Sequence, residues 1–381
     1  MEYNFEDYHK NSFFKAKIHY WDLPDSMSVG FEKLPKGVVP RGENISVKKL
    51  KQQVGNSEEI EKLIDFIWMK NRQKLRIKFP INLNNIYYVR LYALMKSEGS
   101  FKTEFALTVP ELFFHKTFSN SLISILGHDV KRFIRKDIQK GFVRTRATDL
   151  IRHLIPFPKF IPNFILDNKE FCREYLRIAF EAEGSPIISG RKRYISLKRN
   201  CDVTHIFQDK VKGKLGERIY IKKLSEECPA QLEEVIKNPD PLILGEHLIL
   251  KKHFGVNNKI APECVRINET QTRRGFLSLR NDLFIYADNI NQFIKEIDFI
   301  SRQKKHKTKM MLKFNARRER YFIFEVMKSI SKDGVFTRKD FIAETERLGY
   351  KTAWSNLWKY EKKGKIRRIS KGKYAITYQQ A

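Results

Sequence analysis

The sequence predicts an α+β protein with an internally duplicated core and a separate C-terminal domain. Residues 86–100, IYYVRLYALMKSEGS, and residues 171–185, FCREYLRIAFEAEGS, both have the pattern of a helix that ends in Glu-Gly-Ser. Strand-like sequence follows each of these helices. The pattern changes again after about residue 315, which sets the C-terminal region apart. A chain of 381 residues is long enough for two or three domains.

The two helices align on their acidic ends. Leu91–Gly99 faces Leu176–Gly184 with small or apolar residues at the same helical positions, so that Glu98 matches Glu183. The two acids are 85 residues apart, which is the length of one compact α/β half. Small residues near both ends would let the helices approach each other closely.

The segments after each helix continue the repeat. SFKTEFALTV and IISGRKRYISLKRN tend to alternate apolar and basic residues, which would place the cations on one face of a sheet. In the first half a helix over 110–126 and a basic hairpin over 129–147 that turns at Gly141 are expected. In the second half a helix over 245–256, a hairpin over 262–280 and a closing helix over 289–299 are expected, with residues 201–238 as an insertion. Before the first repeat, residues 57–70 have helical spacing.

Charge limits the classes of partner. The chain has 74 Lys and Arg against 44 Asp and Glu, a formal net charge of +30, which indicates a polyanionic partner. Nucleic acid is favoured over membrane because the sequence has neither a long apolar run nor a signal-peptide pattern. We therefore expect no membrane association and a cytoplasmic protein, or a nuclear or organellar one in a eukaryote. The four cysteines form no C-x-x-C pair, which argues against a zinc site.

Paired carboxylates at the ends of adjacent helices suit one kind of chemistry. Phosphodiester cleavage uses divalent metals between the attacking and leaving oxygens, and hard carboxylate ligands suit Mg²⁺. A single acidic-Gly pair is typical of a simple helix stop with Gly in the left-handed conformation. Two such pairs in matching helices favour a shared function for Glu98 and Glu183.

The motif pair and its surroundings resemble the LAGLIDADG homing endonucleases of the single-chain, two-repeat type. Ile161-Pro162 ahead of the second motif looks like the linker of that family, and Asn289–Phe299 looks like its closing helix. The resemblance covers roughly residues 75–315. It implies a duplicated αββαββα core with pseudo-twofold symmetry and antiparallel saddle-shaped sheets. The domains would be an N-terminal extension (1–80), a first repeat (81–160) and a second repeat (161–315) that contains the insertion.

The resemblance also implies site residues and a cofactor. Glu98 and Glu183, with the adjoining Gly99 and Gly184, would hold Mg²⁺ or Mn²⁺, and Lys304 and Lys159 would assist as basic residues near the reacting phosphate. Lys96 departs from the family pattern, which more often has Gly or an acidic residue there. This leaves open a degenerate copy that kept the fold and lost cleavage. The expected DNA contacts in the core are Lys102, Arg191, Lys192, Arg193, Lys198, Arg199, Arg273 and Arg274.

Residues 320–381 resemble a winged helix-turn-helix domain. Three helices are expected, over RYFIFEVMKSI, TRKDFIAETERLG and TAWSNLWKYEKK, followed by a hairpin around Lys371-Gly372. Thr337 with Asp340 has the spacing of a capping box, and Trp354, Leu357, Trp358 and Tyr360 are expected to pack inward. In that fold the third helix enters the major groove. The expected DNA contacts of this domain are Lys359, Lys362, Lys363, Arg367 and Arg368.

Three functions fit these observations. The first is a monomeric, Mg²⁺-dependent, site-specific endonuclease acting on double-stranded DNA. The second is a transcriptional regulator in which the same core is catalytically silent, and the third is a maturase that binds structured intron RNA. All three predict salt-dependent binding to nucleic acid. The domain alone could also be a protein-interaction module.

Overall fold

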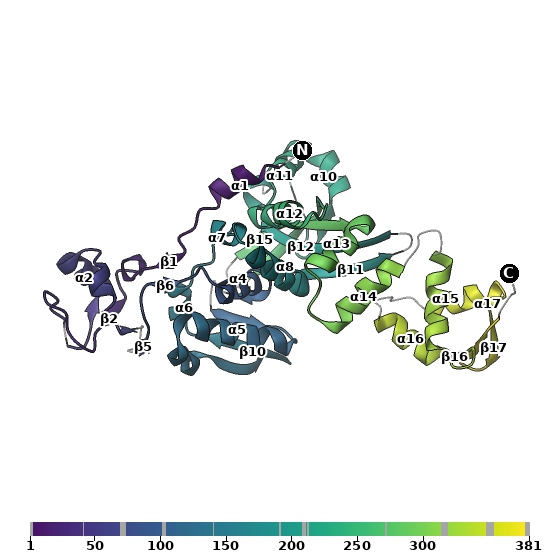
Figure 1. The fold of residues 1–381 in the computed structure, drawn as a ribbon. Coiled ribbons are helices and arrows are strands. Elements are labelled where there is room, and N and C mark those ends of the chain that lie inside the picture. The colour runs from purple at the N-terminus through teal and green to yellow at the C-terminus, as the bar shows by residue number, and fades with distance from the viewer. Residues whose placement is uncertain are drawn as a thin grey trace. The chain divides into compact units, whose positions relative to one another are not determined.

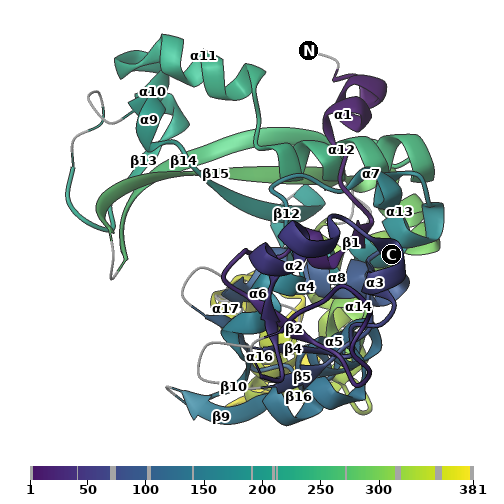
Figure 2. The same cartoon turned by 90° about the vertical axis from the view of Figure 1, so that its left-hand side faces the viewer.

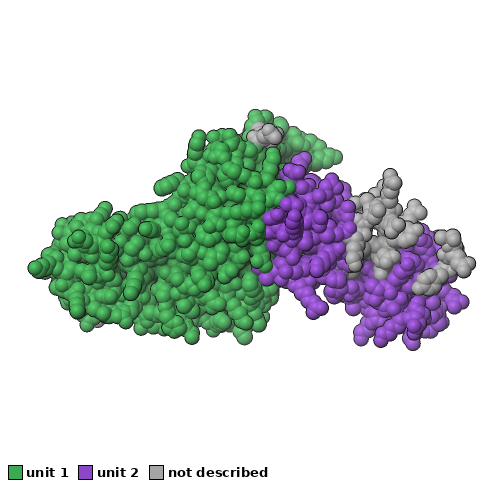
Figure 3. All heavy atoms as spheres, in the orientation of Figure 1, with its two compact units in different colours: residues 1–183, 197–255, 260–283 green, residues 184–196, 256–259, 284–381 purple. Residues whose placement is uncertain are grey.

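The computed structural model has a mixed α and β architecture with several small antiparallel sheets (Figure 1). It describes residues 3–40, 42–68, 74–100, 104–139, 141–189, 192–207, 211, 213–270, 273–313, 319–347 and 354–377. The chain divides into two compact units (Figure 3). Unit 1 contains residues 1–183, 197–255 and 260–283, and unit 2 contains residues 184–196, 256–259 and 284–381.

The N-terminal region forms a small sheet of its own. Its strands run in the order β3-β2-β4-β5, and a separate pair joins β1 to β6. The strands are β1 (Lys17–Ile18), β2 (Ser28–Gly30), β3 (Ile45–Ser46), β4 (Phe66–Trp68), β5 (Lys74–Arg76) and β6 (Ile81–Asn82). The helices are α1 (Phe5–Asn11), η1 (Tyr20–Asp22), α2 (Val47–Val54) and α3 (Glu58–Glu61).

The prediction of a helix over residues 57–70 is correct only for the first turn. Ser57 caps α3 as its position predicts, but the helix ends at Glu61. Phe66–Trp68 then forms β4, in which Ile67 pairs with Val29 on one side and Leu75 on the other. All three of these side chains are fully buried. Aromatic and β-branched residues fit a strand that is paired on both edges, and this tertiary pairing outweighs the helical spacing.

The first half of the core follows the order helix, two strands, helix, two strands, helix. Its sheet has the strand order β7-β8-β10-β9. The basic hairpin is confirmed over β9 and β10, and Gly141 at its turn has a φ of +81°, whereas residues 129–133, expected in the hairpin, belong to η2. The elements are α4 (Ile86–Glu98), β7 (Gly99–Ser100), β8 (Phe105–Thr108), α5 (Leu112–Leu126), η2 (His128–Phe133), β9 (Arg135–Gln139), β10 (Phe142–Ala147) and α6 (Asp149–Leu154).

The second half repeats that element order. Its sheet runs β11-β12-β15-β14-β13, so the first four strands follow the same sequence of positions as those of the first half. Figure 2 shows β14 and β15 as long neighbouring strands. The elements are α7 (Asn163–Leu166), α8 (Lys169–Glu183), β11 (Gly184–Ser189), β12 (Lys192–Asp202), α12 (Pro241–Phe254), β14 (Lys259–Thr270), β15 (Arg273–Tyr286), η3 (Ala287–Asn289) and α13 (Ile290–Glu296).

The insertion carries secondary structure and a core of its own. It contains α9 (Thr204–Phe207), β13 (Arg218–Tyr220), α10 (Ile221–Glu227) and α11 (Pro229–Lys237). Phe207, Leu224 and Leu232 are buried against Val265 and Leu279 of the strands β14 and β15. The insertion therefore extends the second sheet by one strand and covers part of it.

The C-terminal region combines helices with a three-stranded sheet in the order β16-β18-β17. Its elements are α14 (Arg302–Lys313), α15 (Glu319–Ile330), β16 (Val335–Thr337), α16 (Arg338–Arg347), α17 (Trp354–Lys362), β17 (Ile366–Ser370) and β18 (Lys373–Ile376). Thr337 accepts a hydrogen bond from the Asp340 N–H at 3.1 Å, so the predicted cap is confirmed. Leu357 of α17 is buried as predicted. Trp358 is 62% exposed, so the prediction that Trp358 packs inward is wrong.

Candidate functional site

Helices α4 and α8 pack against each other along their length, at the centre of the ribbon in Figure 1. Arg90 of α4 donates to the carboxylate of Glu174 of α8 at 2.7 Å, and the rings of Tyr92 and Tyr175 lie 5.8 Å apart. Both helices end on an acidic residue, Glu98 in α4 and Glu183 in α8. The next residue of each begins a strand, so the two acidic ends occupy equivalent positions in the repeated order.

Gly99 does not end α4 in the way that a simple helix stop does. Its φ is −83° and its ψ is 148°, which is an extended conformation open to any residue. A Cβ at Gly99 would lie 2.7 Å from both the Cα and the carbonyl oxygen of Met95. Glycine is therefore needed because the strand leaves the helix so closely over its last turn, and the left-handed stop does not apply.

A buried ion pair, Arg199 with Glu246, lies next to the C-terminal ends of α4 and α8. The Arg199 guanidinium of β12 is hydrogen-bonded to the Glu246 carboxylate of α12, and neither residue is more than 5% exposed. Glu246 also accepts a hydrogen bond from the Tyr175 hydroxyl of α8 at 2.8 Å. Arg199 donates to the Ser97 hydroxyl of α4 at 3.1 Å. One guanidinium and one carboxylate thus join α4, α8, α12 and β12.

Arg199 is consequently a core residue and not the DNA contact that its strand position suggested. Burial by itself lowers the pKa of Arg199, but the carboxylate of Glu246 outweighs this effect and Glu183 adds to it, so the pKa is raised. Alternation along the strand places Arg199 on the same face as Ile195 and Leu197, which are fully buried, so the side chain enters the core. Glu246 was not predicted as important, although an acid within the apolar run LILGEHLIL is the signal that could have found it.

Lys96 is half-buried beside the same helix end. Its ammonium donates to the Phe157 carbonyl at 3.1 Å. Burial lowers the pKa of Lys96 to about 8; Asp240 opposes this shift, and Arg199 and Lys159 add to it. Lys159, which the family resemblance placed near the phosphate, is exposed and close enough to Lys96 to influence its titration.

The depressed pKa of Lys96 predicts a pH dependence of stability. In the folded protein Lys96 loses its proton near pH 8, whereas the unfolded chain keeps it up to about 10.5. The unfolded state therefore binds more protons between these values, and the contribution of Lys96 to stability rises with pH from about 8. We expect Lys96→Met to flatten the rise in urea midpoint between pH 7.5 and 9.5. An identical pH profile in the variant would contradict the assignment, with Lys49→Met as the exposed control.

Glu98 and Glu183 are both half-buried, so neither residue is sealed in the core. Two hard oxygen donors fit Mg²⁺ in chemistry, and a metal there would supply Lewis-acid activation of a phosphate or of water. Among the described residues no group of three or more His, Cys, Asp or Glu side chains could share a metal ion. The positive charge of Arg199 near Glu183 already offsets part of the negative charge at this point.

Lys304 lies in unit 2, on α14. Its ammonium is 5.6 Å from the centre of the Phe299 ring. Its backbone N–H donates to the Ser301 hydroxyl at 3.4 Å. Lys304 and the motif acids thus belong to different units. Gly184 follows Glu183 as the first residue of β11.

The strand cations that were expected to contact DNA fall into several groups. Lys192 is exposed, Lys198 is half-buried, and Arg193 donates to the Met311 carbonyl at 2.8 Å. Arg273 and Arg274 begin β15, in the part of that strand where only the backbone is described. Lys102 and Arg191 lie outside the described residues.

The cations of the C-terminal region are accessible. Lys359 and Lys362 on α17, Lys363 just after it, and Arg367 and Arg368 on β17 are all exposed. The Lys362 ammonium lies 5.2 Å from the centre of the Trp358 ring. An aromatic ring and several cations therefore share the exposed side of α17.

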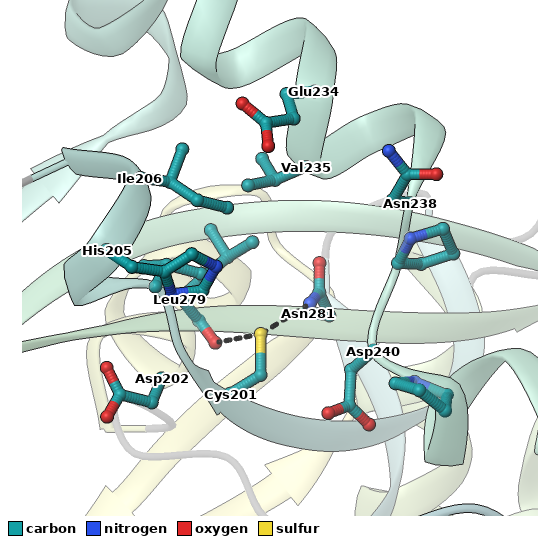
Figure 4. A pocket seen from close by; sticks show the side chains of 13 residues that line it. Cys201, Asp202, His205, Ile206, Glu234, Val235, Asn238, Asp240, Leu279 and Asn281 are labelled. Atoms are coloured by element: carbon teal, nitrogen blue, oxygen red, sulfur yellow. Dashed lines mark hydrogen bonds between the residues drawn. The ribbon is translucent and has the colours of Figure 1, made fainter.

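A cavity of about 240 Å³ lies between the insertion and the second sheet (Figure 4). Asp202, Glu234 and Asp240 line it together with His205 and Asn281. Burial raises the pKa of Asp240, although the Leu242 N–H lowers it, and burial followed by Asp240 raises the pKa of the Cys201 thiol to about 12. These acids make the cavity unsuited to a phosphate.

No family model and no curated protein matches this chain. Among solved structures it is similar to the N-terminal LAGLIDADG domain of DUF199/WhiA, with a TM-score of 0.31 and 13% identity over 59% of this chain and 88% of the other. It is also similar to full-length DUF199/WhiA from Thermatoga maritima, with a TM-score of 0.32 and 12% identity over 65% of this chain and 68% of the other. TM-scores this low do not establish a shared fold, so the interpretation of the fold depends on the repeated element and strand order. No described helix could span a membrane.

Proposed function

We propose that this protein binds double-stranded DNA through a duplicated LAGLIDADG-type core and a C-terminal winged-helix domain. The observation that carries the proposal is the repetition of one strand order. The sheets β7-β8-β10-β9 and β11-β12-β15-β14 have the same connectivity, and each follows a helix tipped by Glu. A repeat of this kind presents two similar sheets to the two similar halves of a duplex.

Charge supports DNA as the partner. The chain carries a formal charge of +30, and Arg135 and Lys136 on β9, Lys192 on β12 and Arg266 on β14 are exposed. Cations on strands contact phosphates and fix the register of a protein on DNA without reading its sequence. In the C-terminal region, the order α15-β16-α16-α17-β17-β18 is that of a winged helix, whose third helix enters the major groove.

The binding proposal is tested by titrating labelled random duplex DNA with the full chain at increasing salt. We expect log K to fall linearly with log salt, with a slope of about −0.9 for each phosphate contacted. Removing the cations of α17 and β17 together, by Lys359→Gln, Lys362→Gln and Arg367→Gln, should lower the magnitude of this slope. Absence of duplex binding at low salt would reject the proposal, and preference for a structured RNA over the duplex would select the maturase.

Cleavage of the bound DNA is a second candidate function. It is favoured by the equivalent positions of Glu98 and Glu183 at the ends of two helices that pack together. A divalent metal held by both carboxylates would activate water toward the scissile phosphate. If the core is catalytically silent instead, the same arrangement supports a transcriptional regulator, and the nearby Arg199 then supplies a permanent positive charge to the acids.

A further inference from the structure

A second basic surface lies where the N-terminal sheet meets the first half of the core. An open groove of about 580 Å³ is lined by Lys74 and Arg76 of β5, by Arg132 of η2 and by Arg135 of β9. Phe66 of β4, and Asp129 and Phe133 of η2, complete its lining. All of these residues belong to unit 1. The groove therefore connects the N-terminal region to the edge strand of the first core sheet.

The aromatic rings in this groove hold cations. The Lys74 ammonium lies 3.9 Å from the centre of the Phe66 ring and 4.9 Å from that of Trp68. Arg76 lies 5.6 Å from the Phe66 ring, and Arg132 lies 4.8 Å from the Phe133 ring. Since these ring faces already carry cations, they are poor platforms for stacking a nucleic-acid base.

The two sides of the groove are tied together by Asp129. Its carboxylate accepts a hydrogen bond from the Arg76 N–H of β5 at 2.8 Å and another from Arg132 at 2.8 Å. Arg132 also donates to the Lys74 carbonyl. These bonds fix the N-terminal sheet on η2, so the groove is set up before any ligand arrives.

Part of the positive charge remains available to a ligand. Glu32 pairs with Arg76, and Asp129 pairs with Arg132. The Lys74 ammonium is 3.9 Å from the Glu43 carboxylate, which is near the limit of an ion pair. The Lys74 side chain is 39% exposed. Arg135 is exposed and has no ion-pair partner among the described residues. Lys74 and Arg135 are thus the two groups best able to receive an anion.

We propose that this groove binds the phosphate backbone of duplex DNA that extends beyond the core sheets. Arg135 and Lys136 begin β9, the edge strand of the first sheet, so the groove continues the surface that the proposed function assigns to DNA. The cations that lie over aromatic rings in this open groove carry the positive charge that a row of phosphates requires. The inference rests on the proposed function and assigns the N-terminal region to DNA flanking the central site.

The test compares the full-length protein with Lys74→Gln/Arg135→Gln on duplexes of increasing length. We expect the affinity of the wild-type protein to rise when the duplex is long enough to reach the groove, and the double variant to lack this rise. On long duplexes the variant should bind roughly tenfold more weakly at about 0.1 M salt, with a salt slope smaller by about 2. On short duplexes, which contact Arg135 on the core surface but do not reach Lys74, the salt slopes of the two proteins should differ by only about 1.

Three controls separate the possible outcomes. Lys49→Gln removes an exposed cation of α2 outside the groove and should leave length dependence unchanged. Lys74→Arg/Arg135→Lys keeps both charges and should restore the slope. Equal slopes for the double variant and wild type on long duplexes would overturn the groove proposal while leaving DNA binding intact. Failure of the wild-type protein to bind any duplex would overturn both the groove proposal and the proposed function. Tighter binding to single strands or to RNA than to duplexes would overturn the assignment of the groove to duplex DNA.

Discussion

Replacing Glu246 by Leu is expected to lower the free energy of unfolding by about 3–5 kcal/mol. The substitution removes the carboxylate that faces the buried Arg199 guanidinium, and leaves that charge without its main partner in the protein interior. It also removes the acceptor of the Tyr175 hydroxyl on α8. Urea denaturation monitored by circular dichroism measures the change, since unit 1 contains every residue of this network.

A matched double variant separates charge from shape. Arg199→Met together with Glu246→Leu removes both charges and should recover much of the lost stability, because well-packed apolar residues can replace a buried ion pair. Asp25→Asn breaks an exposed pair with Lys51 in the same unit and should cost under about 1 kcal/mol. A loss for Glu246→Leu as small as that of Asp25→Asn would contradict the structural role of the network.

For the nuclease candidate, Glu98→Gln and Glu183→Gln should each reduce Mg²⁺-dependent cleavage of duplex DNA by about 10²-fold or more. Each substitution removes a negative charge that a divalent metal needs, and metal activation of phosphate and water is worth several kcal/mol. Both residues are half-buried and glutamine keeps the size of glutamate, so neither substitution leaves a cavity. The assay incubates a library of duplexes with Mg²⁺ and quantifies broken strands.

The binding of the same variants provides the control. Glutamine retains the size of glutamate, and removing a negative charge from a DNA-facing site should leave duplex affinity unchanged or slightly higher. Glu170→Gln changes an exposed acid in the first turn of α8, at the opposite end of the helix from Glu183, and should not alter cleavage. If the wild-type protein binds DNA and breaks no strand under any divalent metal, the nuclease is rejected and the regulator remains.

The sequence alone was sufficient for many of the local elements. The two Glu-Gly ends, the turn at Gly141 and the helix over 112–126 occur where local pattern predicts them, whereas the helix expected over 245–256 begins earlier, at Pro241, and ends at Phe254. The Thr337 cap and the β17–β18 hairpin follow for the same reason. Helix caps, turn glycines and hydrophobic spacing depend on neighbours a few residues away, and these can be read directly from the chain.

The tertiary structure decided which of the charged and aromatic residues are buried. Arg199 and Glu246 are 47 residues apart and form an interior pair, Phe66–Trp68 became a strand between two distant partners, and Trp358 remained exposed. The groove around Lys74 and Arg135 exists only because Asp129 joins two regions of the chain. Local pattern specifies the elements, but the environment of a side chain depends on contacts between residues that only the folded chain brings together.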